Sequence, residues 1–210
     1  EISKIWFKKN LSNNQQCMEY LSKRSLSKKT INTFNIGYSD NPDSTLFNYL
    51  KNQKFKEEDI LKSNVVKIDK NNKIRDFFYK RLIFPIYNEQ NYVVGFGGRV
   101  LDNSNPKYIN SPESFFFKKR SILYNLNNAK NFIRSKKNML ICEGYMDVIS
   151  LYDKNIKTAV APLGTSLTDS HLLLSWKYVN KPTLMFDGDA SGLKASFKSA
   201  ILSLPYLTPS

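Results

Sequence analysis

The chain has 210 residues, of which 41% are apolar, and its formal net charge is +14. That length suits one or two globular cores at about 100–200 residues per domain, and no apolar run approaches the roughly 20 residues that cross a bilayer. The two cysteines, Cys17 and Cys142, lie far apart and show no CxxC spacing. The sequence therefore argues against a membrane protein, a disulfide framework and a zinc site, and it fits a reducing compartment.

The positive charge is concentrated in the first part of the chain. Residues 1–136 carry 25 Lys and Arg against 12 Asp and Glu, whereas residues 137–210 carry 7 against 6. A basic region of this kind is typical of proteins that handle polyanions. Because AT-biased coding also enriches Lys, the arginines are the better guide, and all of them precede residue 137: Arg24, Arg75, Arg81, Arg99, Arg120 and Arg134.

Helical patterns come first along the chain. Apolar residues recur at helical spacing over residues 11–36, where Ser27 is the expected N-cap of a second short helix and Gly37 is expected to end it. Residues 45–63 form another amphipathic stretch. These patterns predict a helical beginning to the basic region.

From Val65 to Phe96 the apolar residues alternate with polar ones, and turn-forming residues interrupt them at 70–73 and 88–91. This pattern predicts an antiparallel meander. Residues 1–136 are therefore expected to form a basic, mixed α+β N-terminal subdomain.

After residue 136, short apolar runs alternate with helical patterns. The expected strands lie at 139–142, 158–161 and 183–186. Each strand is followed by an expected helix, at 145–152, 168–178 and 191–202. A βαβαβα order with short buried strands predicts a parallel sheet covered on both faces, so the fold class is α/β. The only histidine, His171, is expected at the start of a helix as a surface or capping residue rather than a catalyst.

Polar residues follow all three expected strands of this second part. Glu143 follows the first strand, Gly164 and Thr165 follow the second, and Asp187-Gly188-Asp189 follows the third. Open α/β sheets place their sites at the carboxyl ends of the strands, and carboxylate oxygens are the ligands that Mg²⁺ accepts. The sequence thus predicts a divalent-metal site suited to phosphoryl transfer, with Asp147, four residues after Glu143, as a further candidate ligand.

Two basic segments suggest contacts to a nucleotide or nucleic acid. Gly95-Phe-Gly-Gly-Arg99 sets a guanidinium beside small residues, so a phosphate could approach the backbone. A glycine-rich β-bulge would have the same sequence pattern. Residues 107–110 contain a cation, an aromatic ring and an amide. A nucleotide site would use these groups, and a surface loop would have the same composition. Phe115 to Phe117 are expected to belong to the core.

These segments carry a family resemblance. Glu143-Gly144 followed by Asp187-Gly-Asp189 resembles the Toprim module that bacterial primases share with topoisomerases and some nucleases. From about Tyr20 onward the chain is also similar to the RNA polymerase domain of bacterial DnaG-type primases, in six ordered blocks at 81–86, 95–99, 106–113, 123–124, 143–148 and 161–165. A nucleophilic tyrosine in a recognisable gate or winged-helix domain, which the topoisomerase branch needs, is missing from this sequence.

The resemblance implies roles for particular residues. Glu143, Asp187 and Asp189 would be catalytic and, with Asp147, would hold Mg²⁺ or Mn²⁺. The residues implied to contact nucleotide or nucleic acid are Arg24, Arg81, Arg99, Lys107, Tyr108, Asn110 and Lys119. The implied partners are a single-stranded DNA template, ribonucleoside triphosphates and, through a C-terminal region absent from this sequence, a replicative helicase. A monomer in the bacterial cytoplasm, or in an organelle of bacterial descent, is expected.

Two departures from the family pattern qualify this expectation. Phe77 and Tyr79 stand where relatives often have Arg, and the family's third acidic motif, a DPD-like pair, would lie beyond Ser210. The subdomain at 137–210 is therefore expected to be an incomplete Toprim fold. The expected function is a DNA primase core that joins ribonucleotides on single-stranded DNA, a nucleotidyltransferase that is weakly active or inactive in this piece. The alternatives are a catalytically incomplete fragment that binds nucleotide or single-stranded DNA, or another Toprim enzyme.

Overall fold

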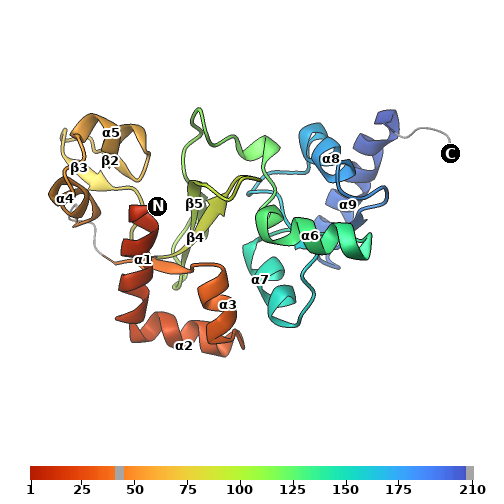
Figure 1. Cartoon of the computed structure of the whole chain (residues 1–210), viewed down its shortest axis with the longest axis horizontal. Helices are drawn as coiled ribbons and strands as arrows, with labels where there is room; N and C mark the ends of the chain where they lie inside the picture. Colours follow the sequence, from red (N-terminus) through yellow and green to blue (C-terminus); the bar gives the residue numbers. More distant parts are fainter. Residues whose placement is uncertain (41–44, 207–210) are drawn as a thin grey trace. The chain divides into compact units, whose positions relative to one another are not determined.

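The computed structural model describes residues 1–40 and 45–206, which divide into two compact units (Figure 1). The first unit comprises Glu1–Ile86 and Tyr92–Ser114, and the second comprises Tyr87–Asn91 and the chain from Phe115 onward. Each unit has its own apolar core. In the described ranges, every helix is too short or too polar to span a bilayer.

The helices of the first unit are α1 (Ile2–Ser12), α2 (Gln15–Lys23), α3 (Lys28–Thr33), α4 (Thr45–Asn52) and α5 (Glu57–Lys62). Ser27 caps α3 as predicted, because its Oγ accepts a hydrogen bond from the N–H of Thr30 at 3.2 Å. The first helix, α1, was not predicted from the sequence. Its residues Phe7 and Leu11 are buried, and Phe7 belongs to the core of this unit.

The predicted helix end at Gly37 is wrong. Helix α3 ends at Thr33, the chain turns at Asn35 with φ of 48°, and Gly37 is the first residue of strand β1 (Gly37–Ser39). A side chain at Gly37 would place its Cβ 2.5 Å from the Cβ of Phe7. Glycine is therefore needed here for close packing against α1 rather than for helix termination.

The predicted antiparallel strands are present, but they form two sheets instead of one meander. Strands β2 (Val66–Ile68) and β3 (Ile74–Asp76) pair only with each other among the described residues. Strands β4 (Arg81–Tyr87), β5 (Val93–Val100) and β6 (Tyr108–Asn110) form a second sheet with β1, in the order β1-β4-β5-β6. In this sheet Arg99 of β5 lies directly opposite Tyr108 of β6.

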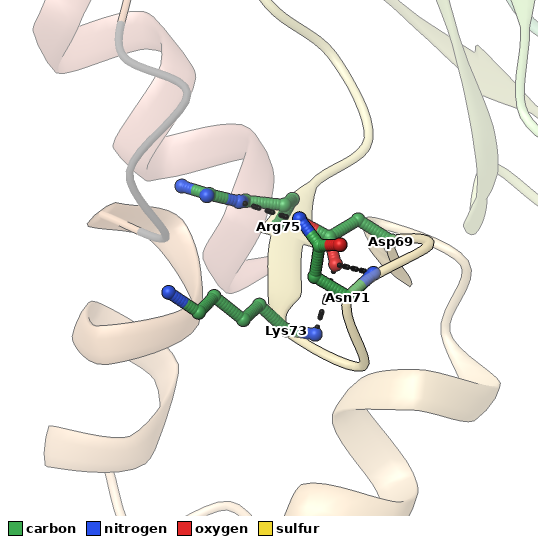
Figure 2. Close-up of polar contacts among 4 residues, drawn as sticks. All are labelled: Asp69, Asn71, Lys73 and Arg75. Atoms are coloured by element: carbon green, nitrogen blue, oxygen red, sulfur yellow. Dashed lines mark hydrogen bonds and ion pairs between the residues drawn. The ribbon is translucent and has the colours of Figure 1, made fainter.

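The turn between β2 and β3 is organised by one carboxylate (Figure 2). Asp69 Oδ1 accepts hydrogen bonds from the N–H groups of Asn71 and Lys73 at 2.8 and 2.9 Å, and Oδ2 accepts one from Arg75 Nε at 3.1 Å. The hydrogen bond from the Lys73 N–H is the main reason why the pKa of Asp69 lies below its ordinary value. The turn that the sequence predicted at 70–73 is thus fixed by the residue before it.

The β2–β3 hairpin also holds a helix. Buried Asp76 accepts hydrogen bonds from the main-chain N–H groups of Leu46 and Phe47 at 3.0 and 3.2 Å. These N–H groups belong to the first turn of α4, where main-chain donors have no partner within the helix. The carboxylate therefore ties α4 to the hairpin.

The second unit contains a parallel sheet with helices around it, as predicted. Its elements in chain order are the 3₁₀ helix η1 (Lys119–Ser121), α6 (Leu126–Lys136), β7 (Leu140–Ile141), α7 (Tyr145–Asp153), β8 (Ala159–Val160), α8 (Asp169–Trp176), β9 (Thr183–Leu184), α9 (Ala190–Ser203) and the 3₁₀ helix η2 (Leu204–Tyr206). The strand order is β8-β7-β9, with both pairings parallel. The α/β fold class and the βαβαβα order are therefore confirmed, and α6 is an element that was not predicted.

The turn at 87–91 packs on this second unit although it joins two strands of the other sheet. The Tyr178 hydroxyl donates to the Glu89 carboxylate, and Lys130 Nζ donates to the Glu89 carbonyl at 2.6 Å. The division proposed from the sequence at residue 136 coincides with the end of α6, within the second unit. The domain boundary at residue 136 stays a prediction.

Candidate metal and nucleic-acid sites

Two acidic strand ends are in direct contact in the second unit. Strands β7 and β9 are neighbours in the sheet, and Glu143 Oε1 accepts a hydrogen bond from the main-chain N–H of Asp187 at 2.9 Å. Both side chains are exposed. The parallel order of the sheet, rather than any closeness in sequence, brings these two segments together.

The other two acidic candidates hold the starts of helices. Asp147 Oδ2 accepts a hydrogen bond from the N–H of Gly144 at 3.0 Å at the start of α7. Asp189 Oδ1 accepts one from the N–H of Gly192 at 2.8 Å at the start of α9. Acidic side chains at these positions also complement the helix dipole.

The donor chemistry of this edge suits a magnesium or manganese ion. Over residues 1–40 and 45–206, no three or more His, Cys, Asp or Glu side chains form a group that could enclose a metal. Mg²⁺ does not need such a group, because it is commonly held by one or two carboxylates together with waters and substrate phosphates. The exposed carboxylates of Glu143, Asp187 and Asp189 fit that kind of open site.

Two glycines around Asp189 have different roles. A Cβ at Gly192 would lie 2.1 Å from the carbonyl oxygen of Asp187, whereas a Cβ at Gly188 would meet nothing within 4 Å. Gly192 therefore allows α9 to pack against the backbone of Asp187, and Gly188 leaves open space between the two aspartates. Gly192 was not among the predicted site residues, and its position three residues after Asp189 is the signal in the sequence that could have indicated it.

A cavity of about 230 Å³ opens beside Glu143. Its lining includes Gly164, which has a φ of 64°, and Thr165, whose buried Oγ1 has no hydrogen-bond partner within residues 1–40 and 45–206. Lys198 of α9 also lines it. The strand end at Gly164 and Thr165 was predicted to belong to the site, whereas Lys198 was not, because nothing in its local sequence distinguishes it from other surface lysines.

Two of the predicted arginines of the first unit lie over aromatic rings. The guanidinium of Arg99 lies 4.7 Å from the ring centre of Tyr20 and 5.5 Å from that of Tyr108, and Arg24 lies 5.5 Å from the ring of Tyr20. Arg99 is buried, and its Nε and Nη1 have no hydrogen-bond partner among the residues that the structure describes. A buried guanidinium with unused donors is suited to a phosphate oxygen. Tyr20, from α2, was not among the predicted site residues.

Arg81 uses its donors on the protein itself. Its guanidinium donates to the carbonyl oxygens of Pro106 and Lys107 at 3.0 and 3.3 Å, and a longer contact of 3.5 Å reaches that of Gly98. Burial lowers the pKa of Arg81. These contacts fix the segment that leads into β6, where Lys107 and Tyr108 are exposed. Direct contact between Arg81 and nucleic acid stays a prediction.

The remaining predicted residues are divided between the units. Asn110 is partly buried in β6 of the first unit, and Lys119 lies in η1 of the second unit. Three consecutive phenylalanines precede η1, and the expectation that all three belong to the core is wrong. Phe117 is fully buried, whereas Phe115 and Phe116 are 88% and 73% exposed.

His171 is a capping residue, as predicted, but it is not on the surface. Its side chain is fully buried, Nδ1 accepts a hydrogen bond from the N–H of Thr168 at 3.3 Å, and Nε2 lies 3.0 Å from the carbonyl oxygen of Lys119. An acceptor Nδ1 and a donor Nε2 define the neutral imidazole. Burial is the main cause of a pKa below the ordinary value.

The parallel β8-β7-β9 sheet with acidic residues after β7 and β9 is a Toprim fold, and residues 137–205 match the Toprim domain. Residues 6–130 match the N-terminal domain of the DNA primase catalytic core. The chain therefore belongs to the DNA primase catalytic core family.

Curated relatives are DNA primases that are much longer than this chain. The primase of Campylobacter jejuni is 41% identical over 198 residues, which cover 94% of this chain and 33% of the relative. That of Clostridium acetobutylicum is 38% identical over 194 residues, covering 92% of this chain and 32% of the relative. The chain thus spans about a third of the length of these proteins.

Solved structures agree with this family. The Aquifex aeolicus primase, with its zinc-binding and RNA polymerase domains, matches with a TM-score of 0.88 and 35% identity, covering 94% of this chain and 49% of that one. A DnaG primase catalytic domain bound to single-stranded DNA matches with a TM-score of 0.86 and 34% identity, covering 98% of this chain and 67% of that one.

Proposed function

We propose that this chain is part of the catalytic core of a primase that synthesises short RNA primers on single-stranded DNA. In this reaction the 3′-hydroxyl of one ribonucleotide loses its proton and attacks the α-phosphate of the next ribonucleoside triphosphate. A phosphodiester bond forms as the bond between the α- and β-phosphates breaks and pyrophosphate leaves. The observation that carries the proposal is the hydrogen bond from Asp187 to Glu143, which unites two acidic strand ends on a fold shared with primases.

The two units have different tasks in this proposal. In the first, Arg24, Arg99, Lys107, Tyr108 and Asn110 bind phosphates and bases of template or nucleotide, while Arg81 positions the segment that carries Lys107. In the second, Lys119 adds a cation, and Glu143, Asp187 and Asp189 are the carboxylates that would hold Mg²⁺ or Mn²⁺, with Asp147 nearby at the start of α7. When bound, the metal would stabilise charge at the phosphate and lower the pKa of the attacking hydroxyl.

We propose that the whole protein has two further parts, in line with the greater length of its curated relatives. We propose that a third acidic motif, carried by the following segment in a longer chain, completes the metal complement, and that a further C-terminal region binds the replicative helicase. The core is proposed to act as a monomer.

A second candidate function rests on the same edge of the sheet. In the proposed primase a third acidic motif from a following segment completes the metal complement. As the alternative, the 210-residue chain by itself binds nucleotide or single-stranded DNA without turnover. Under this proposal the basic first unit still binds polyanions, but synthesis does not follow.

Template-directed incorporation of labelled ribonucleotides separates the two functions. The 210-residue chain should bind single-stranded DNA with steep salt dependence and make little or no primer. A longer version that includes the third acidic motif should make primers, and Glu143→Gln in that version should abolish synthesis with little change in DNA affinity. Silence of the longer version with Mn²⁺, helicase and varied templates would favour the binding function.

A further inference from the structure

The most exposed aromatic residues of the described chain are two neighbours before η1. Phe115 is 88% exposed and Phe116 is 73% exposed, and their rings meet edge to face with centres 5.1 Å apart and planes at 87°. Single exposed apolar side chains are normal on protein surfaces. Two adjacent phenylalanines that are both largely exposed are a stronger sign of a binding surface.

The segment that carries these rings is held firmly on the second unit. Phe117, the next residue, is fully buried. The carbonyl oxygen of Lys119 pairs with His171 Nε2 at 3.0 Å, and that of Arg120 accepts a hydrogen bond from Thr168 Oγ1 at 2.6 Å. The support of the aromatic pair is therefore fixed before any ligand binds, which reduces the ordering cost of binding.

The charge beside the rings identifies the chemistry of the partner. Lys118, Lys119 and Arg120 follow the pair directly, and residues 115–120 contain no Asp or Glu. Lys118 and Arg120 are exposed. Aromatic faces next to cations match a single-stranded nucleic acid, whose bases can stack on rings while its phosphates pair with the cations. A duplex offers its phosphates but keeps its bases stacked inside.

We propose that Phe115 and Phe116 form a base-stacking platform for single-stranded nucleic acid, supported by the cations at 118–120. This inference rests on the proposed function, since it adds a contact to the single-stranded template that the primase core would bind. It extends the nucleic-acid surface to two residues that the sequence analysis had assigned to the core.

Equilibrium binding with two probes tests the platform. The probes are an oligothymidylate of about twelve nucleotides and an abasic strand with the same number of phosphates, each followed by fluorescence anisotropy. The double variant Phe115→Ser/Phe116→Ser should bind the oligothymidylate at least about fivefold more weakly than the unmodified chain. Its affinity for the abasic strand and its salt dependence should hardly change, because the removed groups are uncharged. Tyr92→Ser, which removes another ring of 67% exposure, is the matched control and should bind normally.

A second variant reports stacking directly. Phe116→Trp should keep the affinity, and its fluorescence should be quenched by the oligothymidylate beyond the change shown by Trp6 and Trp176 in the unmodified chain. Unchanged affinity of the double serine variant, or an equal loss with the abasic strand, would overturn the platform. If the unmodified chain itself does not bind the oligothymidylate, that result contradicts the proposed primase function together with the platform that rests on it.

Discussion

Glu143 Oε1 accepts a hydrogen bond from the main-chain N–H of Asp187 at 2.9 Å. The first acidic residue of the candidate metal site therefore also stabilises the strand end that carries the second acidic residue. A glutamine at position 143 keeps an acceptor oxygen but loses the negative charge. This pair therefore allows the structural and electrostatic roles of Glu143 to be separated.

Glu143→Gln should leave the fold stable and weaken metal binding. We expect the free energy of unfolding to change by less than about 0.5 kcal/mol, as for other exposed substitutions, while the affinity for Mn²⁺ falls severalfold because an anionic ligand is lost. Electron paramagnetic resonance titration of free Mn²⁺ measures the second effect. Asp187→Ala should lose Mn²⁺ binding, so that the free-ion signal keeps the intensity it has without protein. Unchanged Mn²⁺ binding in both variants would contradict the metal assignment.

Arg99→Lys should weaken the binding of nucleotides and single-stranded DNA although the charge is kept. Lysine cannot stack as a plane between Tyr20 and Tyr108 or bind a phosphate in a bidentate manner, so a loss of about 1–3 kcal/mol in binding free energy is expected. Isothermal titration with a ribonucleoside triphosphate measures it. Arg75→Lys is the matched control, because Arg75 pairs with Asp69 in the hairpin turn and should affect affinity little.

Tyr20→Phe and Tyr20→Leu should differ in a defined way. The Tyr20 hydroxyl is buried and has no hydrogen-bond partner in the described part of the chain. Tyr20→Phe should therefore leave the free energy of unfolding unchanged or raise it by up to about 1 kcal/mol. Tyr20→Leu removes the ring between Arg24 and Arg99 and should lower nucleotide affinity. Urea unfolding and nucleotide titration check the two effects, and a destabilised Tyr20→Phe variant would show that the hydroxyl has a partner in solution.

Gly192→Ala should disturb the acidic edge, whereas Gly188→Ala should be tolerated. The added methyl group at position 192 would overlap the Asp187 carbonyl, forcing the start of α9 to move, and we expect a loss of about 1–3 kcal/mol in unfolding free energy. At position 188 the methyl group enters open space. Thermal unfolding of the two variants side by side makes the comparison, and equal stabilities would contradict the packing described for α9.

His171 should make the chain less stable as the pH falls below neutral. Its pKa in the folded state is lowered by burial below the ordinary value of about 6.5. The unfolded state therefore binds a proton more readily, so the stabilisation is fully present above that value and is lost as the pH falls below it. Between about pH 7.5 and 5.5 the melting temperature should fall more in the unmodified chain than in His171→Gln. As the chain has one histidine, parallel curves would contradict this assignment.

Local sequence patterns determined most of the second unit. Its three strands and the helices that follow them were predicted within a few residues, because buried strands bounded by turns and amphipathic helices leave signals within about ten neighbouring residues. The same local patterns predicted that Glu143 and Asp187 lie at the ends of strands. The parallel order of the strands then implied that these ends lie at one edge of the sheet.

The failures involve interactions between distant parts of the chain. Gly37 has the local signal of a helix end, but the packing of Phe7 against it decides its place in β1. Residues 115–117 are all phenylalanine, and only the packing of the second unit around them determines which ring is buried.

The sequence by itself determined the types of most elements, the acidic strand ends and the basic character of the first part, since periodicity and charge are properties of neighbouring residues. Only the tertiary structure decided which side chains meet. Tyr20 reaches Arg99 because α2 and β5 fold together, and Arg81 is occupied by carbonyl oxygens because the segment before β6 passes over it. Such contacts depend on packing and backbone hydrogen bonds formed across many intervening residues, and no local pattern encodes them.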